Sequence, residues 1–152
     1  KPELNHRFKG SLPPLHLAAT TCNLEVMRML IKSGSDVNGR DDTYWMSPLS
    51  VAVMLQPRQE VISALLDAGA DIDSADRSGL TPLMAAALGG SLIAVDALIA
   101  RGAALEVEDL KGGCVLVCAA EGGNDEIVKR IPDQADRAKA RADREGVLRV
   151  CA

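Results

Sequence analysis

Apolar residues recur along this chain in a pattern with a period of about 33 residues. A Pro-Leu dipeptide begins each of three short apolar runs, at residues 14–19, 48–53 and 82–87, and these starts are equally spaced. A fourth run begins one period later at Val115, where the proline is absent. Because proline is well tolerated in the first turn of a helix, each dipeptide predicts the start of a helix.

A second, longer run follows each of the first three short runs, and its apolar residues have the spacing of an amphipathic helix. These runs occupy residues 24–32, 60–67 and 92–100. Each is followed by a glycine in the place of a left-handed helix cap, at Gly34, Gly69 and Gly102. Each period therefore predicts two helices joined by a short break and followed by a polar turn.

The period and the motif resemble those of the ankyrin repeat, which has about 33 residues and a T-P-L-H-x-A signature. The third unit, with GLTPLMAAALGG, is the best match, and the first has Pro13 in place of threonine. The second unit has Trp45 where the family usually has glycine, and one extra residue near Pro57. In the fourth unit, Pro132 is expected to stop the second helix early. The resemblance covers about residues 8–132.

The resemblance implies an all-α ankyrin-repeat solenoid of about four helix-turn-helix units with a C-terminal capping helix. The expected domain spans residues 1–132, with repeats at about 8–41, 42–75, 76–108 and 109–132. Residues 133–152 have a helix-forming composition with oppositely charged residues four apart, which supports a helix. We expect this segment either to cap the last repeat or to begin a linker.

Composition narrows the kinds of ligand that this fold would bind. The formal net charge is -4, which argues against nucleic acid because such binding depends on clustered Lys and Arg. No apolar run reaches the roughly 20 residues of a membrane helix, so we expect no membrane insertion. The four cysteines form no CxxC pair, which favours free thiols in the cytoplasm or nucleus, and we expect no metal and no cofactor.

The expected shape favours recognition over catalysis. A solenoid offers an extended concave surface, whereas small substrates are bound in enclosed cavities. None of the common catalytic motifs is present, and His16 lies in the PLHLAA motif, where the family uses it to tie one repeat to the next by hydrogen bonds. We therefore expect a monomeric adaptor or scaffold and not an enzyme. The alternative is a targeting or regulatory ankyrin domain of a larger multidomain protein, such as an enzyme or channel.

Ankyrin-like proteins present their turn tips and the exposed ends of their inner helices to partners. The expected partner-binding residues are Leu12, Arg40, Tyr44, Trp45, Met46, Met54, Leu55, Arg77, Leu80, Leu88, Lys111 and Glu121. Most of them are apolar, and contiguous exposed apolar surface usually marks an interaction site. The alternative is plain packing, with Met54 and Leu55 turned inward by the insertion and Trp45 lying flat on its own repeat.

The charges along the edge of this surface refine the expected partner. Four basic residues, Lys9, Arg40, Arg77 and Lys111, lie on the turn edge despite the acidic total. We therefore expect a protein or peptide ligand with apolar and acidic side chains, bound either as a helix or as an extended strand. Its affinity should fall as salt is added.

Overall fold

The computed structural model describes residues 12–55 and 57–131, and these contain eight α-helices and no strand. Inner helices alternate along the chain with outer helices. The inner helices are α1 (Pro14–Thr20), α3 (Pro48–Leu55), α5 (Pro82–Leu88) and α7 (Val115–Glu121). The outer helices are α2 (Leu24–Lys32), α4 (Gln59–Asp67), α6 (Leu92–Ala100) and α8 (Asp125–Arg130).

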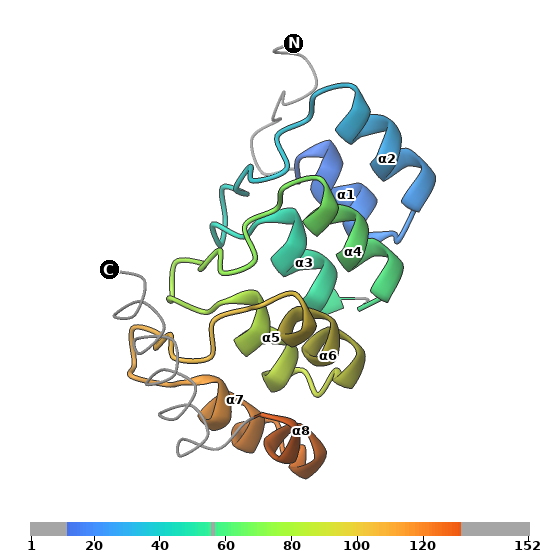
Figure 1. Cartoon of the computed structure of the whole chain (residues 1–152). Helices are drawn as coiled ribbons and strands as arrows, with labels where there is room; N and C mark the ends of the chain where they lie inside the picture. Colours follow the sequence, from blue (N-terminus) through green and yellow to red (C-terminus); the bar gives the residue numbers. More distant parts are fainter. Residues whose placement is uncertain (1–11, 56, 132–152) are drawn as a thin grey trace, which may run out of the picture.

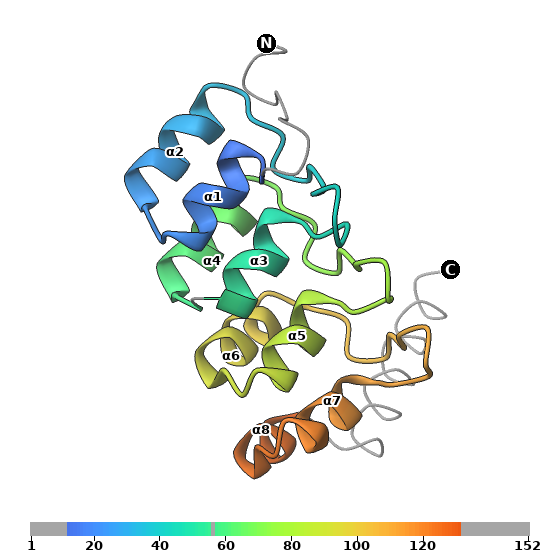
Figure 2. The ribbon, with the colours of Figure 1, turned by 180° about the vertical axis from the view of Figure 1, so that it is seen from behind.

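The four helix pairs are stacked in one direction (Figure 1). The inner helices pack in the order α1, α3, α5, α7, and the outer helices pack in the order α2, α4, α6, α8. The turns between repeats lie beside the inner helices and away from the outer ones, as the reverse view also shows (Figure 2). The predicted all-α stack of four helix-turn-helix units is therefore confirmed for the described residues, while the predicted cap at residues 133–152 lies outside them.

Local signals in the sequence place the helix ends. Pro14, Pro48 and Pro82 are the first residues of α1, α3 and α5, as predicted. The glycines that follow α2, α4 and α6 have φ values of 91°, 91° and 85°, which is the left-handed region that favours glycine. The last outer helix, α8, has only six residues and ends at Arg130, before Pro132.

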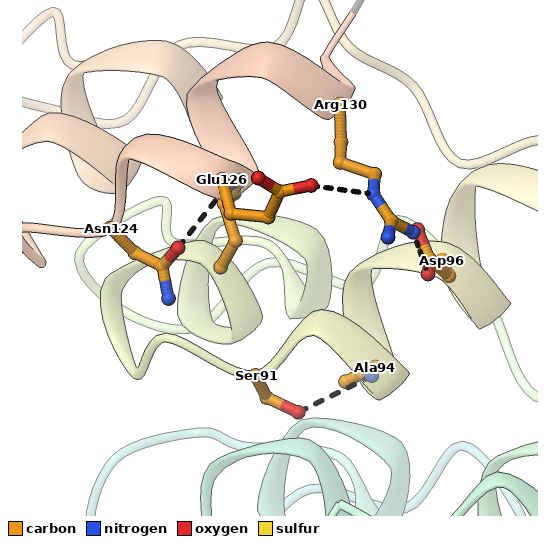
Figure 3. Close-up of polar contacts among 7 residues, drawn as sticks. Ser91, Ala94, Asp96, Asn124, Glu126 and Arg130 are labelled. Atoms are coloured by element: carbon orange, nitrogen blue, oxygen red, sulfur yellow. Dashed lines mark hydrogen bonds and ion pairs between the residues drawn. The ribbon is translucent and has the colours of Figure 1, made fainter.

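Side-chain caps begin three of the four outer helices. Asn23, Ser91 and Asn124 each accept a hydrogen bond from the backbone N–H three residues further on. Figure 3 shows this contact at Ser91 and Asn124. Each cap satisfies an N–H group that has no partner within its helix, which is worth about 1 kcal/mol.

The core runs along the whole stack between inner and outer helices. Fully buried leucine, isoleucine, valine and methionine side chains fill it, and neither Tyr44 nor Trp45 belongs to it. Ala52, Ala86 and Ala119 lie at equivalent places on the inner helices and are each 0% exposed. Side chains this small let neighbouring helix backbones approach closely, which explains why so few large rings are needed.

Polar contacts also join successive repeats. The buried imidazole of His16 makes a 2.9 Å hydrogen bond through Nε2 with the carbonyl oxygen of Met46 in the next repeat, as predicted. On the outer helices, Arg101 pairs with Asp67 and Arg130 pairs with Asp96 (Figure 3). Both ion pairs are about half exposed and contribute little to stability, so the apolar core and the buried hydrogen bonds hold the repeats together.

Candidate protein-binding surface

A hollow opens between the turns and inner helices of the first three repeats, with a volume of about 440 Å³. Its lining consists of Leu12, Asp41, Tyr44, Met46, Val51, Met54, Leu55, Asp76 and Leu80. We call this feature the apolar hollow. Six of these nine residues belong to the predicted partner-binding set, so the structure brings half of that set together at one place.

The side chains at the mouth of the apolar hollow are open to solvent. Tyr44 is 66% exposed, Leu55 is 60% exposed and Met54 is 49% exposed. Met54 and Leu55 are therefore not turned inward, which was the alternative left open by the insertion near Pro57. Leu80 is half-buried and packs against the core, so it forms part of the wall.

Asp41 holds the turn that carries Tyr44, Trp45 and Met46. Its carboxylate is 3% exposed and accepts hydrogen bonds from the backbone N–H groups of Thr43, Tyr44 and Met46. Burial raises the pKa of Asp41, but these hydrogen bonds outweigh burial and hold the pKa below its ordinary value. The carboxylate is therefore ionised at neutral pH and fixes the rim of the apolar hollow.

Sequence reasoning did not assign Asp41 this role. A signal for its role was present, because Asp76 and Asp109 stand at the corresponding places in the third and fourth repeats. Asp76 accepts hydrogen bonds from the N–H groups of Ser78 and Leu80, and Asp109 accepts the corresponding pair in its own turn. An aspartate that recurs shortly before each of these inner helices is therefore a turn-forming residue.

Trp45 occupies a backbone position that the third and fourth repeats give to glycine. Its φ is 63°, and the equivalent Gly79 and Gly112 have φ values of 82° and 77°. The ring is 47% exposed and is not in the lining of the apolar hollow. The Arg77 guanidinium of the next repeat lies 5.9 Å from the ring centroid, so the Trp45 ring contacts the third repeat.

The strained backbone at Trp45 leads to a prediction that separates the effect of the backbone conformation on stability from the effect of the ring. Trp45→Gly and Trp45→Ala both remove the ring, but only glycine adopts the left-handed backbone without cost. We expect the glycine variant to be more stable than the alanine variant by about 1 kcal/mol in urea unfolding. At Leu88, which is helical, the order should reverse, with alanine more stable than glycine by up to about 1 kcal/mol. The same order at both sites would contradict strain at Trp45.

Two of the predicted basic residues also join repeats. Arg40 donates hydrogen bonds to the carbonyl oxygens of Trp45 and Ala75, at 3.2 and 2.9 Å. Arg77 donates to the carbonyl oxygen of Asp42 at 3.1 Å. Sequence reasoning missed these contacts, which link the turn before α3 to the turn before α5. Part of the hydrogen-bonding capacity of both side chains is therefore already used.

The remaining predicted residues do not line the apolar hollow. Leu88 is 43% exposed at the end of α5, and Lys111 and Glu121 are exposed in the fourth repeat. Lys9 lies outside the described residues. These positions extend the surface along the stack, but the described residues that line the hollow include no Lys or Arg.

The described residues offer neither a metal-binding cluster nor a membrane-spanning helix. No group of three or more His, Cys, Asp or Glu side chains there could hold a metal ion. None of the helices in residues 12–55 and 57–131 has the length and apolar character needed to cross a membrane.

A stack of helix-turn-helix units with an open, apolar-lined hollow defines a solenoid repeat protein. The family model described as ankyrin repeats (3 copies) matches residues 2–76 and 49–140. The chain therefore belongs to the ankyrin repeat family. Ankyrin repeat domains generally mediate protein binding and are typically not catalytic.

The chain is similar to parts of several longer proteins. The chain is 36% identical over 70 residues to ankyrin repeat and SOCS box protein 6 of Mus musculus, which is 46% of this chain and 17% of that protein. It is 34% identical over 82 residues to protein phosphatase 1 regulatory subunit 27 of Mus musculus, covering 54% of this chain and 52% of that one. It is 35% identical over 157 residues to ankyrin repeat and KH domain-containing protein mask-1 of Caenorhabditis elegans, covering 97% of this chain and 6% of that one. The chain thus spans only part of these relatives.

Proposed function

We propose that this chain is an adaptor or scaffold module that holds an apolar segment of a partner protein in the apolar hollow. The observation that carries the proposal is the exposure of Tyr44, Met54 and Leu55 around one hollow. Apolar side chains gathered in this way on a protein surface usually mark an interaction site. Tyrosine is also enriched among the residues that dominate binding energy, and methionine adapts to varied partners.

The partner proposed for this surface is a protein or peptide with apolar and acidic side chains. Its apolar side chains would enter the hollow, where Asp41 and Asp76 already accept backbone hydrogen bonds. Its acidic side chains would then lie outside the hollow, within reach of the exposed Arg77 and Lys111. Such a module would act as a monomer in the cytoplasm or nucleus.

A second candidate function is a targeting or regulatory domain within a larger multidomain protein. The comparisons favour it, because the matched regions cover 17% of ankyrin repeat and SOCS box protein 6 and 6% of mask-1. The two candidates differ in whether the same reading frame encodes a further domain. In both, the apolar hollow would be the surface that recognises the partner.

The test of the proposed function removes the exposed side chains without touching the core. A partner captured from native extract and then purified should bind the Tyr44→Ala/Leu55→Ala variant at least about tenfold more weakly than the unaltered chain. The melting temperature should change by no more than about 2 °C, because both side chains are mostly exposed. Ile93→Ala is the matched control, since Ile93 is 56% exposed on the outer helix α6, away from the hollow.

The same binding measurement tests the charged part of the proposal. Raising the salt concentration from about 0.05 to about 0.5 M should weaken binding if acidic groups of the partner meet the basic edge. Equal affinity of the Tyr44→Ala/Leu55→Ala variant and the control would reject the hollow as the binding site. Affinity that does not change with salt would reject the acidic partner.

A further inference from the structure

The first repeat exposes apolar side chains on the side that faces away from the second repeat. Leu17 on α1 is 55% exposed, and Val26 and Met29 on α2 are 42% and 62% exposed. Leu30 is half-buried beside them. We call these four residues the N-terminal end face. None of them lines the apolar hollow, so this surface is separate from the proposed partner-binding site.

The other three repeats show what happens at the position of Leu17. It is the fourth residue of its inner helix, and the equivalent residues are Val51, Ala85 and Cys118. These are only 5%, 6% and 3% exposed. The same place in the fold is therefore buried wherever a preceding repeat is present, and it is exposed in the first repeat.

The outer helices give the same result independently. Val26 corresponds to Val61, Ala94 and Ile127, which are 1%, 0% and 0% exposed. Leu30 corresponds to Leu65, Leu98 and Ile131, which are 0%, 0% and 3% exposed. The end face thus carries, on both of its helices, the apolar surface that repeats two to four bury against their predecessors.

The opposite end of the stack shows which residue of each inner helix faces the preceding repeat and which faces the following one. The third residue of each inner helix is 1% exposed at His16, 2% at Ser50 and 1% at Met84, but 43% at Val117 in the last repeat. The third residue therefore faces the following repeat, in agreement with the hydrogen bond from His16 to Met46. The fourth residue, which behaves in the reverse way, faces the preceding repeat.

We propose that the N-terminal end face receives a further ankyrin-type helix pair, supplied by the same polypeptide upstream of Lys1. The proposal rests on the exposed face and on its continuity with three repeat interfaces of the same design. The segment 1–11 is too short to supply such a pair, because α1 and α2 alone contain 7 and 9 residues. A terminal repeat of a solenoid normally has a polar outer face, and Leu17, Val26 and Met29 are not polar.

Two alternatives for the end face lead to different results. If a second copy of the chain covers it, the protein should self-associate. If it is simply exposed to solvent, an added repeat should not raise the melting temperature. This proposal does not depend on the proposed function, because the proposed partner binding uses Tyr44 and Leu55 and not the end face. Loss of binding in the hollow variants and failure of the end-face experiments are therefore distinguishable results.

The direct test is to sequence the gene upstream of the codon for Lys1. The expected result is a reading frame that encodes two amphipathic helices, with the first beginning about 33 residues before Pro14. A reading frame that starts near Lys1, or that encodes no helix pair, would overturn the proposal.

The physical test extends the full chain with a copy of its own third repeat, residues 76–108, placed in register before the first. The extended chain should unfold in a single transition, with a melting temperature higher by about 5 °C or more. Leu17→Glu should remove most of this gain, yet it should change the melting temperature of the unextended chain by less than about 2 °C. An unchanged melting temperature, or a separate transition for the added repeat, would overturn the proposal.

Thr20→Glu provides the matched control on the same helix. The residues equivalent to Thr20 are Met54, Leu88 and Glu121, all of which stay exposed inside the stack. This variant should therefore be neutral in both backgrounds. Sedimentation of the unextended chain completes the test, because self-association that Leu17→Glu abolishes would assign the end face to a second copy and overturn the proposal.

Discussion

Replacing Asp41 with asparagine is expected to lower the free energy of unfolding by about 2–3 kcal/mol, even though the volume of the side chain hardly changes. The buried carboxylate accepts three backbone hydrogen bonds, from Thr43, Tyr44 and Met46. An amide offers one oxygen where the carboxylate offers two, and its NH₂ group would face N–H donors. Urea unfolding measures this loss. Partner binding should weaken as well, because Tyr44 and Met46 line the hollow.

The pH dependence of stability identifies the carboxylate as the cause. Hydrogen bonds hold the pKa of Asp41 below its unfolded value, so its stabilisation is present above the unfolded pKa of about 3.9. It is lost as the pH falls through the folded pKa. The unaltered chain should therefore lose more stability than Asp41→Asn between about pH 4 and pH 2. The neighbouring exposed Asp42→Asn is the control, and equal acid sensitivity of all three proteins would contradict the assignment.

The repeat architecture could be predicted because its signals are local and recur. Proline at the start of α1, α3 and α5, and glycine after α2, α4 and α6, each depend on residues within a few positions. The equal spacing of Pro14, Pro48 and Pro82 then requires equivalent helices to pack on one another. The hydrogen bond from His16 to Met46 followed from the family motif, and the structure confirms it.

The roles of the polar turn residues could not be derived in the same way, because their partners are distant in the sequence. Arg40 binds the carbonyl oxygen of Ala75, 35 residues away, and such a contact exists only when two repeats are stacked. The turn position that the family presents to partners, together with its charge, placed Arg40 on a binding edge. The side chains of Met54 and Leu55 were also ambiguous, because one inserted residue changes the rotation of a helix end.

The exposed surface at the first repeat shows a further limit to what can be predicted from the sequence. Leu17 reads as an ordinary core residue, since valine, alanine and cysteine fill its place in the other repeats. Only the exposed fractions separate it from Val51 and Ala85. Periodicity therefore identifies the faces that repeats present to each other, and the structure identifies which of those faces are covered.

At Gly122 the backbones of the third and fourth repeats approach closely, and a substitution there should have a large effect on stability. A Cβ atom at Gly122 would lie 2.5 Å from the carbonyl oxygen of Leu88 and 2.9 Å from that of Ala87. Both contacts are with backbone, which cannot rotate away, so the repeats would have to separate. We expect Gly122→Ala to lower the free energy of unfolding by about 2–4 kcal/mol in urea unfolding.

Gly89 is the matched control, because it holds the same place after α5 that Gly122 holds after α7. Their φ values are -75° and -71°, so neither backbone is strained and only the neighbouring repeat differs. The nearest atom to a Cβ at Gly89 is 3.3 Å away and belongs to the preceding helical turn, so Gly89→Ala should change stability by less than about 1 kcal/mol.

The reactivity of the Cys118 thiol, which is 3% exposed on α7, shows whether the packing of α7 is the part that weakens. Gly122→Ala should speed its reaction with a thiol reagent, because α7 loosens from α5. Equal effects of the two alanines would show that the close approach does not limit the stacking.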